Sequence, residues 1–270
     1  MSDDQKNHIN ELEEYSTEEP VLVSSAHVPK RGIYLLPNAI TTANLFAGFF
    51  AIMQAMNHRF EWAALAIFAA MVMDGMDGRI ARLTNTQSSF GEQYDSMADM
   101  VSFGIAPALV MYTYTLDDLG RWGWLAAFIY VAGAALRLAR FNSNINIIDS
   151  RFFQGLPSPA AAALTAGFVW LSVDNRLPIS GAHSWVAFFI TVYAGLTMIS
   201  NAPFFSGKSG FLQEKRSPVL IMTALVLLFA LLMLNAPLVI TLAFLSYTGS
   251  GWVVMFLRWR KAKRLRRQRE

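Results

Sequence analysis

The chain has 270 residues, of which 54% are hydrophobic and only 15% charged, and its mean hydropathy is +0.35. These values exclude an ordinary soluble domain and are typical of a protein with several membrane spans. The absence of cysteine excludes disulfides and thiolate metal sites, and the net charge of +3 comes largely from a basic C-terminal tail rather than from a nucleic-acid-binding face.

Residues 1–30 are polar and acidic, with few aromatic residues, and we expect them to form a disordered tail. A short interfacial segment over residues 31–37 then leads into a membrane domain over residues 31–257. Residues 258–270 form a second tail that is strongly basic. This tail either attracts anionic lipid headgroups or acts only as a determinant of topology.

Within the membrane domain, apolar stretches recur at about the length of 20 residues that a helix needs to cross a bilayer. We predict an all-α bundle of about eight transmembrane helices, in which a six-helix core is followed by a C-terminal hairpin that turns at Asn235-Ala236-Pro237. Six spans are the alternative, if the stretches 95–115 and 157–173 do not cross. The predicted helices are 38–56, 62–83, 95–115, 122–141, 157–173, 184–202, 217–234 and 237–257.

Basic residues are concentrated in the loops on one side of this bundle, the side on which both termini lie. The positive-inside rule therefore predicts that both termini are cytoplasmic. The basic residues on this side, apart from the C-terminal tail, are Lys30, Arg31, Arg140, Arg151, Lys208, Lys215 and Arg216.

The most informative stretch contains four aspartates: Asp74, Asp77, Asp95 and Asp99. Ionisable groups at membrane depth are costly, and they mark functional sites by default. If the second helix starts near Trp62 on the outer side, Asp74 lies about 18 Å into the membrane at about 1.5 Å per residue. We therefore expect the aspartates in the cytoplasmic half of the membrane, where a polar headgroup can reach them while its tails stay in lipid.

Helical periodicity places the aspartates on facing helices, with small residues beside them. On the second helix, one arc of about 100° holds Asp74, Asp77, Gly78 and Ala81, with Arg82 at its edge. On the third helix, one face holds Gly91, Asp95, Asp99 and Ser102. The two helices together are expected to present four carboxylates to one cavity, and the small residues leave room for a ligand or a partner helix.

Four neighbouring carboxylates repel one another unless a cation is present. Hard oxygen ligands favour Mg²⁺, Mn²⁺ or Ca²⁺, and a pair of such ions can clamp a phosphoryl group that is being transferred. Two other interpretations remain at this point. One is a transporter with a cation site at the membrane midplane, and the other is a set of buried ion pairs with Arg79, Arg82, Arg137 and Arg140.

The pattern Asp-x-x-Asp-Gly-x-x-Ala-Arg-x₈-Gly-x₃-Asp-x₃-Asp resembles the signature of the CDP-alcohol phosphatidyltransferases. A Pro-Asn-x-x-Thr stretch at the first helix of these enzymes is similar to Pro37-Asn38-Ala39-Ile40-Thr41. The positions that match the signature are Asp74, Asp77, Gly78, Ala81, Arg82, Gly91, Asp95 and Asp99.

The resemblance implies transfer of a phosphatidyl group from a CDP-linked lipid to an alcohol, with release of CMP. It implies two divalent cations, Mg²⁺ or Mn²⁺, and a homodimer. The implied metal ligands are Asp74, Asp77, Asp95 and Asp99, and Asp99 is also the implied general base on the acceptor hydroxyl. The implied CDP-binding residues are Asp77, Gly78, Ala81, Arg82, Asn38 and Thr41.

Three further stretches, over residues 102–107, 137–142 and 153–159, resemble the branch of this family that uses L-serine as the acceptor alcohol. Serine is a zwitterion, so its site needs a cation for the carboxylate and acceptors for the ammonium. Our candidates for this acceptor site are Arg137, Arg140, Asn142 and Ser102. The simpler interpretation is that the arginines snorkel to headgroups and mark topology.

Other acceptors with the same chemistry are glycerol 3-phosphate, inositol phosphate and choline. For localisation, we expect an integral protein of a bacterial inner membrane, with the active site and both termini facing the cytoplasm.

Overall fold

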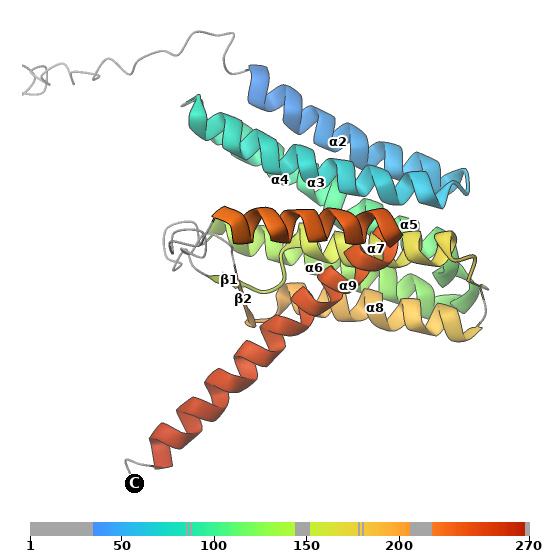
Figure 1. Ribbon diagram of the computed structural model, residues 1–270. Helices are drawn as coiled ribbons and strands as arrows, with labels where there is room; N and C mark the ends of the chain where they lie inside the picture. The colour runs from blue at the N-terminus through green and yellow to red at the C-terminus, as the bar shows by residue number, and fades with distance from the viewer. Residues whose placement is uncertain are drawn as a thin grey trace, which may run out of the picture.

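The computed structural model describes residues 35–84, 86, 88–143, 152–177, 179, 181–205 and 218–267. The expected N-terminal tail and the last three residues of the basic tail lie outside this range. Long helices that alternate in direction form a bundle, and the second half of the last helix extends beyond it (Figure 1). The predicted all-α class is confirmed, and each predicted apolar stretch overlaps a helical segment.

The helical segments α2 to α5, the π-helices η1 and η2 and the short 3-10 helix η3 form the first half of the bundle. Their bounds are α2 Leu35–Met56, α3 Phe60–Leu83, α4 Ser89–Asp99, η1 Met100–Ile105, α5 Ala106–Met111, η2 Tyr112–Leu116 and η3 Asp117–Leu119. The second half consists of α6 Arg121–Ser143, α7 Ser158–Asp174, α8 Gly181–Ile199 and α9 Pro218–Arg267, with two short strands, β1 Phe152–Gln154 and β2 Pro203–Phe205.

Four of the described helices are long and apolar enough to cross a membrane. They are Leu35–Met56, Arg121–Ser143, Gly181–Ile199 and the stretch Val219–Lys261 within α9. The chain is therefore an integral membrane protein. α3 has a comparable length of 24 residues. It is not among these four helices, because it carries the charged residues Asp74 and Asp77 into the same bundle.

The predicted third helix is a continuous helical run that starts at Ser89 and contains two π-helical segments. Ser88 caps its start, since the side-chain oxygen accepts a 3.0 Å hydrogen bond from the Gly91 amide. Pro107 lies within this run and has no N–H to donate to the Phe103 carbonyl. The buried hydroxyl of Tyr130 on α6 donates to that carbonyl at 3.1 Å, which ties the π-helical region to α6.

α9 consists of two helices that meet at Asn235, where the backbone is non-helical (φ −161°, ψ 88°). The side-chain oxygen of Asn235 accepts a 2.9 Å hydrogen bond from the Leu238 amide and caps the second helix. Figure 1 shows the chain turning back at this point, as the predicted hairpin requires. The second helix packs on α7, where Gly167 lies against Thr241.

The two short strands pair antiparallel and join the segments that precede α7 and follow α8. This ribbon was not predicted from the sequence. Gly155 continues from it with φ +79°, and a side chain there would overlap the Met198 carbonyl oxygen. The ribbon and Gly155 place the start of α7 next to the end of α8, on the same side of the bundle as the C-terminal end of α6 (Figure 1).

Candidate active site

The second halves of α3 and α4 bring the predicted aspartates together beside α2. Asp74 comes from α3, and Asp95 and Asp99 come from α4. One carboxylate oxygen from each of these three residues lies within 4.8 Å of the others. The predicted convergence of two helices on one acidic centre is thus present in the structure for three of the four aspartates.

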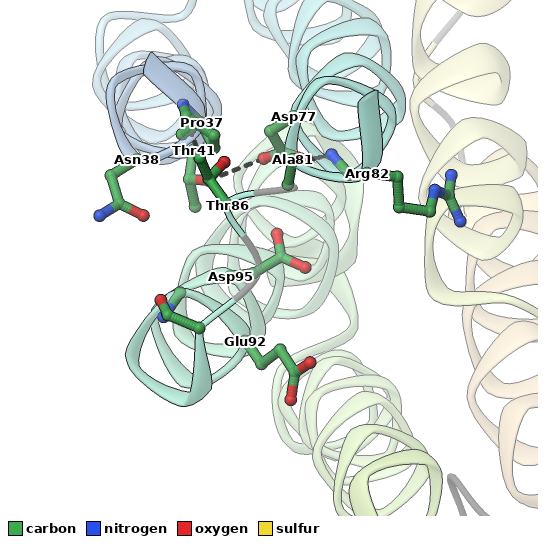
Figure 2. Close-up of a pocket in the computed structure, with 12 residues that line it drawn as sticks. Pro37, Asn38, Thr41, Asp77, Ala81, Arg82, Thr86, Glu92 and Asp95 are labelled. Atoms are coloured by element: carbon green, nitrogen blue, oxygen red, sulfur yellow. Dashed lines mark hydrogen bonds between the residues drawn. The ribbon is translucent and has the colours of Figure 1, made fainter. Parts of the chain in front are cut away.

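Asp77 lies apart from this group of three and faces α2. It is only 4% exposed, and its Oδ2 accepts a 2.9 Å hydrogen bond from the hydroxyl of Thr41. Figure 2 shows Asp77 and Thr41 pointing toward each other across the gap between the two helices, with Asp95 below them.

A pocket of about 190 Å³ opens between the start of α2, the end of α3 and the start of α4. All six residues expected to bind CDP contribute to its wall, together with Asp95 (Figure 2). The pocket therefore adjoins the acidic centre through Asp95. Its lining residues are Pro37, Asn38, Thr41, Asp77, Gly78, Ala81, Arg82, Thr86, Ser88, Gly91, Glu92 and Asp95.

The wall of this pocket is open at Gly78, because a Cβ atom added there would have no neighbouring atom within 4 Å. The Arg82 side chain leaves the same helix but points away from Asp77 and Asp95 (Figure 2). A guanidinium at this position makes bidentate hydrogen bonds to a phosphate when one is in reach. The geometry thus provides space and a guanidinium group at the rim of the pocket.

The acidic centre fits a divalent cation, since its three donors are carboxylate oxygens and no soft ligand is present among them. A buried oxygen of Asp95 has no hydrogen-bond partner among the described residues. Within the same residues, none of the four aspartates forms an ion pair with an arginine. Arg137 acts on Asp74 and Asp99 electrostatically from a greater distance. The alternative of a set of buried ion pairs is therefore not what the structure shows.

The four candidates for the acceptor site lie in different surroundings. Arg137 donates a 2.7 Å hydrogen bond to the hydroxyl of Ser158 at the start of α7. Arg140 donates to the Ile199 carbonyl at 2.9 Å and to the side-chain oxygen of Asn201 at 3.3 Å. Arg137 is thus directed between α6 and α7, beside the acidic centre, whereas Arg140 holds the end of α8.

The other two acceptor candidates also have partners. The amide of Asn142 donates to the Ser96 hydroxyl at 3.1 Å. Ser102 is fully buried, and its hydroxyl donates to the Asn44 carbonyl at 3.0 Å. The lining of the described pocket includes none of the four acceptor candidates.

Two polar residues outside the predicted site residues lie at this site. Asn44 is fully buried on α2, and its amide donates to Oδ1 of Asp99 at 3.3 Å. Ser158 accepts from Arg137. The signal for Asn44 was available, because it is a polar residue in an apolar helix, three positions after Thr41 and thus on the same face. Ser158 lies in the stretch 153–159 that resembles the serine-using branch, but its contact with Arg137 depends on the fold.

Comparison with known proteins gives one family and a consistent set of relatives. Residues 34–196 match the family described as CDP-alcohol phosphatidyltransferase. The chain is 40% identical over 175 residues to the CDP-diacylglycerol–serine O-phosphatidyltransferase of Helicobacter pylori, which covers 64% of this chain and 73% of the relative.

Two more distant relatives carry the same description. The Methanocaldococcus jannaschii protein is 34% identical over 171 residues, covering 63% of this chain and 74% of the relative. The Mycobacterium leprae protein is 34% identical over 180 residues, covering 63% of this chain and 58% of the relative. The segment that matches the family contains all four aspartates and ends before α9 begins.

Proposed function

Because this chain belongs to the CDP-alcohol phosphatidyltransferase family, we propose that it transfers the phosphatidyl group of CDP-diacylglycerol to the hydroxyl of L-serine. The products are phosphatidylserine and CMP. The observation that carries the proposed chemistry is the group of Asp74, Asp95 and Asp99 oxygens within 4.8 Å of one another, next to the pocket. Serine as the acceptor is supported by the descriptions of the relatives.

We propose that the four aspartates hold two divalent cations, Mg²⁺ or Mn²⁺, with Asp77 joining the group of three from the pocket side. When bound, such ions neutralise the carboxylates and stabilise the charge of the transferred phosphate. The nucleotide occupies the pocket, where Asn38, Thr41, Gly78 and Ala81 form the wall. Arg82 turns toward the diphosphate when the substrate is bound.

In the proposed reaction, Asp99 takes the proton of the serine hydroxyl. The serine oxygen then bonds to the β-phosphorus of CDP-diacylglycerol, the bond between this phosphorus and the bridging oxygen breaks, and CMP leaves with that oxygen. Holding both substrates in line contributes a large part of the rate in phosphoryl transfer. The chain's role is therefore mainly to position groups around the aspartates.

Of the acceptor candidates, Arg137 has the surroundings best suited to the carboxylate of the substrate serine, because it lies between α6 and α7 beside the acidic centre. Arg140 and Asn142 are proposed to shape the same region from the end of α6. The hydroxyl of Ser102 is engaged with α2, so any contribution of Ser102 to serine binding is indirect. The active site and both termini are proposed to face the cytoplasm from the bacterial inner membrane, in agreement with the distribution of basic residues.

A single assay with the purified protein tests the reaction. CMP release is measured with CDP-diacylglycerol and Mn²⁺ or Mg²⁺, in parallel with serine, glycerol 3-phosphate, inositol phosphate and choline. Of the four acceptors, we expect only serine to support CMP release. This release should be lost in excess chelator and in Asp99→Asn. Release that depends on another acceptor would replace serine in the proposal, and turnover in chelator would refute the metal requirement. Cross-linking in membranes tests the proposed homodimer.

A further inference from the structure

Asn44 is a buried polar residue that has no assigned role in the proposed reaction. It has no exposed surface, and burying an amide is costly unless it is hydrogen-bonded. Its Nδ2 donates to Oδ1 of Asp99 at 3.3 Å, whereas its own Oδ1 has no partner among the described residues. A half-satisfied amide at a fully buried position indicates a specific role next to the acidic centre.

The main chain of Asn44 is fixed to the same helical run as Asp99. The Ser102 hydroxyl donates to the Asn44 carbonyl at 3.0 Å, and Ser102 lies one turn after Asp99. Gly48, one turn after Asn44, lies directly against Ser102, so any side chain at residue 48 would overlap it. Close packing and two hydrogen bonds therefore fix the position of Asn44 along the helix axis relative to Asp99.

We propose that Asn44 is a positioning residue for Asp99, an inference that rests on the proposed function. The amide nitrogen can only donate, so it keeps Oδ1 of Asp99 as an acceptor. The other carboxylate oxygen, Oδ2, is then left for the acceptor hydroxyl and for metal binding. Displacement of a reacting group by about 1 Å can lower the rate about 100-fold, so a fixed carboxylate is of direct value here.

The test compares Asn44→Ala and Asn44→Asp with the wild type, as full-length protein in nanodiscs. We expect kcat to fall about 10- to 100-fold in Asn44→Ala, as for other groups that orient a ligand residue, with an unchanged KM for CDP-diacylglycerol. Mn²⁺ affinity, followed by electron paramagnetic resonance without substrate, is expected to weaken about tenfold in this variant. Asn44→Asp keeps the shape but lacks the donor, and we expect at least the same loss of kcat.

Thr42→Val is the matched control. The Thr42 hydroxyl forms a 2.9 Å hydrogen bond with the Tyr94 hydroxyl across the same two helices, at an exposed position. We expect wild-type kcat and Mn²⁺ affinity in this variant. Wild-type values in Asn44→Ala would overturn the proposal, and so would an equal loss in Thr42→Val, which would assign the effect to helix packing.

The outcome for Asn44 is separable from the outcome for the acceptor. If the wild type releases CMP with another alcohol, serine is wrong but the Asn44 comparison is made with that alcohol. The Mn²⁺ titration needs no acceptor at all, so it tests the link from Asn44 to Asp99 even without turnover.

Discussion

The hydroxyl of Thr41 on α2 donates a 2.9 Å hydrogen bond to Oδ2 of Asp77 on α3. This contact joins the first helix to the acidic stretch at the wall of the nucleotide pocket. Together with the bond from Asn44 to Asp99, it makes α2 a source of donors for two carboxylates on two different helices.

Thr41→Val is therefore expected to misplace Asp77 while preserving the volume of the side chain. A hydrogen bond to a charged group contributes about 1.5–3 kcal/mol, so we expect kcat/KM for CDP-diacylglycerol to fall about tenfold or more. The KM for serine should stay the same, because Thr41 does not contact the acceptor candidates. Steady-state kinetics with each substrate varied in turn measures both values, and an unchanged kcat/KM would contradict the role of Thr41.

Gly78→Leu is expected to fill the nucleotide pocket without disturbing the fold. A Cβ at residue 78 meets no atom within 4 Å, and leucine favours helix over glycine by about 1 kcal/mol. The KM for CDP-diacylglycerol should rise about tenfold or more, since burying a nucleotide needs this space. Gly75→Leu is the control, because residue 75 is equally open but does not line the pocket. Equal effects of the two substitutions on KM would contradict the assignment of the pocket.

Arg137→Lys tests the acceptor site. Lysine keeps the charge but lacks the planar fork that binds a carboxylate with two hydrogen bonds. We expect the KM for serine to rise about tenfold, with little change in the KM for CDP-diacylglycerol. The control is Arg121→Lys at the opposite end of α6, which should behave like the wild type. A rise confined to the lipid substrate would instead place Arg137 at the diphosphate.

Tyr247→Phe tests whether α9 contributes to the acceptor region from outside the segment that matches the family. Tyr247 donates to the Phe205 carbonyl at 3.1 Å, lies against Phe204 and is near Arg137. Loss of one such bond costs about 0.5–1.5 kcal/mol, so we expect the KM for serine to rise roughly two- to tenfold.

The matched control for this substitution is Tyr193→Phe. The Tyr193 hydroxyl also attaches α9, through a 3.0 Å bond to the Thr248 carbonyl, but the structure shows no interaction between Tyr193 and Arg137. Similar losses in both variants would mean that α9 acts only through stability, which thermal unfolding of the two proteins measures independently.

The helices were predictable because apolar stretches of membrane length are a strong signal. The predicted helix 62–83 agrees with α3, Phe60–Leu83, to within two residues at its start. The start of α4 lies six residues before the predicted start, because Ser89 to Tyr94 are mostly polar and their helical state depends on the Ser88 cap. The β1–β2 ribbon had no signal, since strands of three residues form only where two loops happen to meet.

At the site, the spacing of the aspartates predicted two facing helices, and the resemblance to the family implied the residues of one pocket. Spacing along a helix does not fix rotation between helices, so it did not show that Asp77 pairs with Thr41 while the other three aspartates converge. The same limit applies to Arg140. Its sequence context is similar to that of Arg137, but only the fold shows that it holds the end of α8.

The π-helical segment η1, Met100–Ile105, directly follows Asp99. A π-helical turn accommodates one extra residue, which in an α-helix corresponds to a rotation of about 100° for everything that follows. Asp95 and Asp99 before this turn face the acidic centre, whereas Val110 and Met111 after it are buried in the core. The direction of the carboxylates before η1 and the direction of the core side chains after it are therefore set separately, by the rotation that η1 introduces. Deletion of one residue within η1 would re-aim either the carboxylates or the core side chains, but could not keep both in place.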